Sequence, residues 1–127
     1  NCFCTMGAGI AKTIKEKFPE AYKADKETEK GDKSKLGEIS WAETKTQNGK
    51  LIIVNGYTQF NWRGRGRKAD YEAIRSVFRN IKEKFSGLRI GYPAIGAGLA
   101  GGDWEIISEI IKDELKGENH TFVEYQK

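Results

Sequence analysis

The stretch that decides the fold is Asn1-Cys2-Phe3-Cys4-Thr5-Met6-Gly7-Ala8-Gly9-Ile10-Ala11, called here the first glycine loop. Gly7 and Gly9 carry no side chain that would block the backbone, so the N–H groups of this stretch can turn toward one point. A charged helix is predicted to begin near Ile10, and its N-terminal end adds a positive partial charge. Together these features predict a site for a phosphate or a pyrophosphate.

A similar arrangement follows later in the chain, at Ile95-Gly96-Ala97-Gly98-Leu99-Ala100-Gly101-Gly102-Asp103, called here the second glycine loop. Two such loops in one domain favour a ligand with two phosphates, held between two helix N-termini. Gly96, Gly98 and Gly101 also match the G-x-G-x-x-G pattern of a Rossmann dinucleotide site, with Glu124 at a suitable distance for a ribose contact. Against that alternative, the sequence lacks the second, repeated half of a Rossmann fold.

Length and composition predict a single domain over residues 1–127. The chain is 38% hydrophobic and 31% charged, which is typical of a folded protein rather than a disordered one. Its net charge of +4 gives a mild preference for anions. Without a signal peptide or a run of about 18 apolar residues, we expect a cytoplasmic protein with no membrane association.

Metal ions and cofactors are not expected. Cys2 and Cys4 lie two residues apart, so on an extended chain their side chains point to opposite faces and a disulfide between them is disfavoured. No cluster of His, Asp and Cys has the spacing of metal ligands.

The hydrophobic pattern predicts an α/β fold of three layers, α/β/α, with a mixed central sheet. Pro19 either kinks the first helix or starts a second one. Leu51 to Tyr57 reads as a central strand covered on both faces, because its first four residues are all apolar. The predicted elements are a helix over 10–22, a surface loop over 25–35, a strand over 36–43, a turn at Asn48-Gly49, a strand over 51–57, a helix over 70–85, a strand over 88–95, a helix over 104–115 capped by Asp103, and a strand over 121–125.

These residues together resemble macro domains, which bind ADP-ribose. The resemblance spans nearly the whole chain and is strongest to the terminal ADP-ribose protein glycohydrolases and the DarG-type DNA ADP-ribosyl glycohydrolases. ADP-ribose 1″-phosphate phosphatases are more distant relatives. The residues that carry it are Asn1, Met6, Gly7, Gly9, Ile10, Ala11, Lys15, Phe18, Trp62-Arg63-Gly64, Arg67, Pro93, Ile95, Gly96, Gly98, Leu99 and Trp104.

The resemblance implies a role for each loop. Asn1 would hold the distal ribose, and Met6, Gly7, Ala8, Gly9 and Ile10 would wrap the diphosphate through backbone N–H groups. Ile95, Gly96, Ala97, Gly98, Leu99 and Ala100 would close over the diphosphate from the other side. Lys15, with Asn1, is the implied catalytic residue, and in the protein glycohydrolases such a lysine attacks the anomeric carbon. Ala100 stands where those enzymes carry an assisting aspartate, which favours a DarG-like reaction.

The residues themselves leave alternatives open at two places. Lys15 is one of several lysines on its helix, and on spacing alone it is equally explained as a solvated side chain. The segment from Phe60 to Lys68 interleaves aromatic residues with cations, which is typical of a platform for single-stranded DNA. Trp62, Arg63, Arg65 and Arg67 would then contact nucleic acid; alternatively Trp62 packs on the core and the arginines lie on the surface.

We therefore expect a monomeric macro domain that acts as a hydrolase, releasing ADP-ribose from a DNA base or a protein carboxylate. An ADP-ribose 1″-phosphate phosphatase and a non-catalytic reader of ADP-ribose are the alternatives. Relatives carry early strands, including an aspartate for the adenine, before the first glycine loop. We accordingly expect the natural protein to extend further at its N-terminus.

Overall fold

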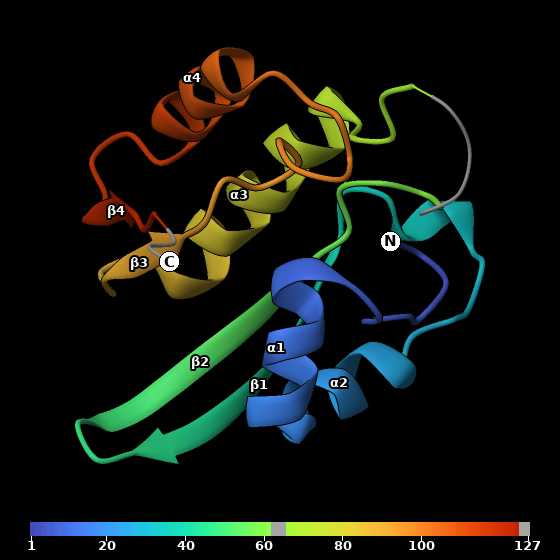
Figure 1. Ribbon diagram of the computed structural model, residues 1–127. Coiled ribbons are helices and arrows are strands. Elements are labelled where there is room, and N and C mark those ends of the chain that lie inside the picture. The colour runs from blue at the N-terminus through green and yellow to red at the C-terminus, as the bar shows by residue number, and fades with distance from the viewer. Residues whose placement is uncertain (62–65, 125–127) are drawn as a thin grey trace.

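Two long helices lie side by side in the computed structural model, which describes residues 1–61 and 66–124 (Figure 1). α3 (Tyr71–Phe85) and α4 (Trp104–Glu114) pack against each other through apolar faces. Ile74 of α3, together with Ile107 and Ile111 of α4, is completely buried. Burying each such side chain stabilises the fold by about 1.5–3 kcal/mol.

Both helices begin where the sequence predicts. The Asp70 carboxylate accepts a hydrogen bond from Ala73 N at 3.0 Å, and the Asp103 carboxylate accepts one from Glu105 N at 2.9 Å. These side chains satisfy N–H groups that the first turn of a helix leaves without an intrahelical partner.

The strands form two separate pairs. β1 (Ile39–Thr46) and β2 (Gly49–Gly56) make an antiparallel hairpin, in which Trp41 lies opposite Val54. The turn consists of Gln47 and Asn48, one residue before the predicted Asn48-Gly49, and Gly49 begins β2 opposite Thr46. β3 (Ile90–Tyr92) and β4 (His120–Phe122) pair in parallel, with Ile90 opposite His120. Both kinds of pairing expected of a mixed sheet are thus present, but in the described residues no ladder joins β2 to β3.

An apolar groove of about 870 Å³ separates the two strand pairs. Its floor is α3, including Val77 and Phe78, and β2 and β3 form its walls. The prediction that residues 51–57 form a central strand covered on both faces is therefore wrong for this structure, because Leu51 is 40% exposed. A strand becomes central only through a neighbour on each side, and the apolar run cannot specify those neighbours.

The N-terminal third contains two short α-helices and one 3₁₀ helix. α1 (Gly9–Lys17) ends before Pro19, which starts α2 (Pro19–Lys26), so one of the two possibilities for this proline is realised. The surface loop predicted over 25–35 is wrong in part. Asp25 and Lys35 are buried, and residues Lys33–Lys35 form a 3₁₀ helix. The sequence predicted a surface loop because this segment has few apolar residues, but the side chains that pack into the structure here are charged.

None of the helices in the described ranges is long and apolar enough to cross a lipid bilayer.

Candidate functional site

The first glycine loop is a tight, internally bonded turn that leads into α1. The Asn1 side chain accepts a hydrogen bond from Phe3 N at 2.9 Å and donates one to Thr5 Oγ1 at 2.8 Å. Cys4 has a φ of 57°, in the left-handed region that side chains disfavour. Such a conformation costs about 1–2 kcal/mol, so neighbouring contacts must hold it.

The N-terminal end of α1 is open to an anion. Its N-cap residue is Ala8, whose side chain makes no capping hydrogen bond, and its first turn contains no acidic residue. Among residues 1–61 and 66–124, the N–H groups of Gly7, Ala8 and Gly9 have no acceptor. Unpaired N–H groups at the positive end of a helix dipole favour a phosphate.

The second glycine loop is held by backbone hydrogen bonds within the loop, whereas the Asn1 side chain holds the first. Gly102 N donates to Gly96 O at 2.7 Å, and Gly101 N donates to Gly98 O at 3.0 Å. At the N-terminus of the following helix, α4, the Asp103 carboxylate accepts a hydrogen bond from Glu105 N. An anion would meet a negative charge there, so the two helix N-termini are not equivalent and the open one belongs to α1.

One connection links the two loops. Residues 57–70 run from β2 to α3, and near their start Phe60 O accepts a hydrogen bond from Cys2 N at 2.9 Å. Near their end, Lys68 N and Ala69 N both donate to Ala100 O, at 2.7 and 3.1 Å. The described ends of this connection therefore each contact one glycine loop, Phe60 the first and Lys68 with Ala69 the second.

The predicted ligand residues divide by exposure. Gly7, Ala8, Gly9, Gly98 and Leu99 are exposed, and Ile95, Gly96 and Ala97 are half-buried. Met6 and Ala100 are buried, so their side chains support the loops from within. Each loop also presents one large exposed apolar side chain, Ile10 at 57% and Leu99 at 79% exposure. Exposed side chains of this size at the site are suited to contact the apolar faces of a ligand.

Lys15 lies further along α1 and makes a specific contact there. Its Nζ sits 4.3 Å from the centre of the Tyr22 ring on α2. Six residues of helix place it roughly 9 Å along the axis from Gly9. This contact ties the Lys15 side chain to α2.

The basic segment is described only in part. Trp62, Arg63 and Arg65 lie outside the described residues. Arg67 is exposed, and its guanidinium stacks 4.0 Å from the centre of the Tyr71 ring. Tyr71 Oη accepts a hydrogen bond from Asp103 N at 3.1 Å, and this bond, with one from Arg67, lowers the pKa of Tyr71. Arg67 is thereby placed at the end of the second glycine loop, where α4 begins.

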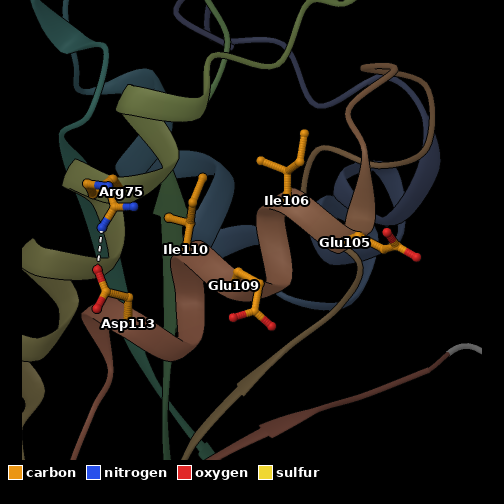
Figure 2. A pocket seen from close by; sticks show the side chains of 6 residues that line it. All are labelled: Arg75, Glu105, Ile106, Glu109, Ile110 and Asp113. Carbon is orange, nitrogen blue, oxygen red and sulfur yellow. Dashed lines mark hydrogen bonds and ion pairs between the residues drawn. The ribbon is translucent and has the colours of Figure 1, made fainter.

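A shallow hollow on α4 is not part of this site (Figure 2). It measures about 670 Å³, and its lining includes the carboxylates of Glu105, Glu109 and Asp113. The one cation in it, Arg75, already pairs with Asp113 at 2.7 Å. Such a surface repels phosphates. In the described ranges, no group of three or more His, Cys, Asp or Glu side chains is placed to hold a metal ion.

The sequence pattern missed two residues beside the first glycine loop. Lys35 donates from Nζ to Cys2 O at 3.0 Å, and Asp25 accepts a hydrogen bond from Tyr57 Oη at 2.7 Å. Burial raises the pKa of the Tyr57 phenol, so it remains a hydrogen-bond donor to that carboxylate. A segment without apolar residues gives no signal for such burial, because charge ordinarily predicts exposure.

Comparison with known proteins gives the family. The model of the macro domain matches residues 1–111. The chain belongs to the macro domain family. An uncharacterised 17.5 kDa protein of Enterobacteria phage T4 is 38% identical over 116 residues, covering 87% of this chain and 73% of that protein. This match also covers most of the macro domain described here.

One further relative has a functional name, and one solved structure shares the fold. The DNA ADP-ribosyl glycohydrolase of Mycobacterium tuberculosis (strain ATCC 25618 / H37Rv) is 29% identical over 110 residues, covering 86% of this chain but only 31% of that protein. The structure of Thermosipho africanus DarTG in complex with ADP-ribose superposes with a TM-score of 0.76 at 21% identity, covering 98% of this chain and 36% of that one. This second likeness shows a shared macro domain fold.

Proposed function

We propose that this macro domain binds ADP-ribose between its two glycine loops and hydrolyses the bond that joins ADP-ribose to a modified acceptor. The diphosphate would sit on the N–H groups of Gly7, Ala8 and Gly9 at the open end of α1. The second glycine loop would cover it through Gly98 and Leu99. The likeness to a DNA ADP-ribosyl glycohydrolase favours a DNA base over a protein carboxylate as the acceptor.

The observation that carries the binding proposal is the contrast between the helix N-termini. α3 and α4 are capped by aspartates, whereas α1 has an alanine cap and unpaired N–H groups among the described residues. These N–H groups are exposed, so water satisfies them in the free protein and no protein group has to move before a ligand replaces that water. A phosphate at this end of α1 satisfies them and interacts favourably with the dipole.

A non-catalytic reader is the second candidate, and the two implied catalytic residues favour it. The Lys15 ammonium is held over Tyr22, and the Asn1 amide is engaged by Phe3 N and Thr5. Both side chains would have to leave these contacts before they could act on a ligand. Binding through backbone N–H groups requires no such change.

The deciding experiment measures release of free ADP-ribose from three substrates in parallel. These are an ADP-ribosylated thymidine oligonucleotide, an ADP-ribosylated protein and ADP-ribose 1″-phosphate, with phosphate release followed for the last. Each is tested with wild type, Lys15→Ala and the matched control Lys12→Ala, an exposed lysine on the same helix. Release from one substrate that Lys15→Ala alone abolishes establishes the hydrolase and its acceptor. Binding of ADP-ribose without any release establishes the reader.

The DNA acceptor has a separate test. Arg67 flanks the second glycine loop, and Arg63 and Arg65 precede it in the same basic segment. Charge reversal at Arg63 and Arg65 is expected to lower turnover of the oligonucleotide at low salt and to leave free ADP-ribose binding intact. Unchanged turnover would contradict a role for this segment in nucleic-acid binding.

A further inference from the structure

A buried lysine lies directly behind the first glycine loop. Lys35 ends the 3₁₀ helix and is only 7% exposed. Its Nζ donates to Cys2 O at 3.0 Å, lies 3.6 Å from Cys4 Sγ, and sits 4.8 Å from the centre of the Tyr57 ring. A buried ammonium is stable only while its protons have acceptors. Two of these three contacts are supplied by the loop itself, so the burial of Lys35 depends on the loop's conformation.

A buried carboxylate balances this charge through a shared partner. Asp25 is 4% exposed and accepts a hydrogen bond from Tyr57 Oη, while the ring of the same tyrosine faces Lys35. Asp25 also reaches the loop through its backbone, because its carbonyl oxygen lies 3.4 Å from Cys4 Sγ. α2, the 3₁₀ helix and the β2–α3 connection therefore converge on residues 2–4.

The strained residue of the loop is at the centre of these contacts. Cys4 has a φ of 57°, and its Sγ also approaches Thr28 Oγ1 at 3.5 Å. The carbonyl of Cys2 receives a second hydrogen bond, from Gly31 N at 2.7 Å. Without these contacts a non-glycine residue would relax toward negative φ, and the chain that follows it would change direction.

We propose that Lys35 is a positioning residue for ligand binding: its buried ammonium holds Cys2 and Cys4 so that the N–H groups of Gly7–Gly9 stay directed at the ligand. This inference rests on the proposed binding of ADP-ribose at α1. Lys35 does not touch the ligand; it acts through the backbone of residues 2–4.

The test compares Lys35→Met with Lys30→Met, which removes the same charge from an exposed position nearby. Calorimetry with ADP-ribose, well below the unfolding temperature of each variant, separates binding from stability. We expect the Kd of Lys35→Met to rise about tenfold or more, because a hydrogen bond to a charged group is lost. Lys30→Met should bind like wild type. A folded Lys35→Met with wild-type affinity would overturn the proposal.

A rescue variant distinguishes positioning from general destabilisation. Glycine adopts positive φ without strain. Adding Cys4→Gly to Lys35→Met should therefore recover much of the lost affinity, although it restores no stabilising contact. Failure of the rescue would show that Lys35 does not act through the conformation of Cys4. If Lys35→Met does not fold, Lys35→Gln takes its place; it lacks the ammonium and is one bond shorter, so wild-type affinity in that variant would equally refute the proposal.

Amide hydrogen exchange tests the role of Lys35 in the loop without requiring that ADP-ribose binds. In Lys35→Met the hydrogen-bonded amides of Cys2 and Gly31 should exchange faster while those of α3 stay unchanged. If wild type fails to bind ADP-ribose, the proposed function fails, but this readout still tests whether Lys35 holds the loop. Unchanged exchange at Cys2 and Gly31 would refute the positioning role whether or not ADP-ribose binds.

Discussion

Gly102→Ala is expected to destabilise the second glycine loop by close contact with the backbone. A Cβ atom at this position would lie 2.6 Å from the carbonyl oxygen of Gly96 and 2.7 Å from Ile107 Cδ1. Ile107 is fully buried, so its side chain has no open space to move into. The Gly96 carbonyl accepts a hydrogen bond from Gly102 N at 2.7 Å, and it cannot withdraw without weakening that bond.

The magnitude follows from these two contacts. Overpacking a well-packed position costs about 1–3 kcal/mol, and weakening one hydrogen bond costs about 1 kcal/mol. We expect Gly102→Ala to lower the free energy of unfolding by about 2–3 kcal/mol. For a chain of this size, that corresponds to a fall in Tm of roughly 8–12 °C.

Urea denaturation followed by circular dichroism measures this effect, with Gly98→Ala as the matched control. Gly98 belongs to the same loop, has no heavy atom within 4 Å of a built Cβ, and does not have positive φ. Its substitution should leave the free energy of unfolding within about 0.5 kcal/mol of wild type, because alanine restricts the unfolded chain without a clash. If Gly102→Ala is as stable as Gly98→Ala, the reasoning from close packing is refuted.

Three further predictions concern the core, the surface charges and the groove. Ile107→Ala should lower the free energy of unfolding by about 2–5 kcal/mol in urea denaturation, whereas Ile106→Ala, at a position 44% exposed, should cost far less; equal effects would contradict the assigned core. Burial acts to raise the pKa of Glu114, but hydrogen bonds from Arg79 and Arg75 lower it below the ordinary 4.5. Its carboxylate thus adds stability above about pH 4.5 that is lost as pH falls through the lower folded-state pKa. The urea midpoint of Glu114→Gln should therefore lie below wild type at pH 7, and the difference should shrink as the pH falls below 4.5; a constant difference would contradict this. In the described residues β2 pairs only with β1, so fast and slow amide exchange should alternate along it. Uniformly slow exchange along β2 would contradict this one-sided pairing.

The helices could be read from the sequence because their signals are local. The apolar spacing of α3 repeats within a few residues, and Asp70 marks its start. The same holds for α4 and Asp103. Interactions three and four residues apart determine a helix, and a single sequence contains them all.

The arrangement of the strands could not be read in the same way. The Asn48-Gly49 pair is a local signal that predicted the hairpin, although the turn lies one residue earlier, at Gln47-Asn48. The partner on the other side of β2 depends on contacts across the whole chain, and an apolar run such as Leu51–Val54 does not name it. The prediction of a central strand therefore failed, although both antiparallel and parallel pairing are present.

By itself, the sequence determined the two glycine loops, the helices that follow them and the resemblance to macro domains. Glycine positions and helical periodicity are patterns among residues close together in the sequence, so they can be recognised without the fold. Only the tertiary structure decided that α1 has the open N-terminus, that Phe60 bonds to the first glycine loop and that Ala69 bonds to the second. It also decided that Lys35 is buried against Cys2, 33 positions away. Burial of a charge depends on partners brought together by folding, and no local pattern encodes which distant carbonyl will accept the hydrogen bond.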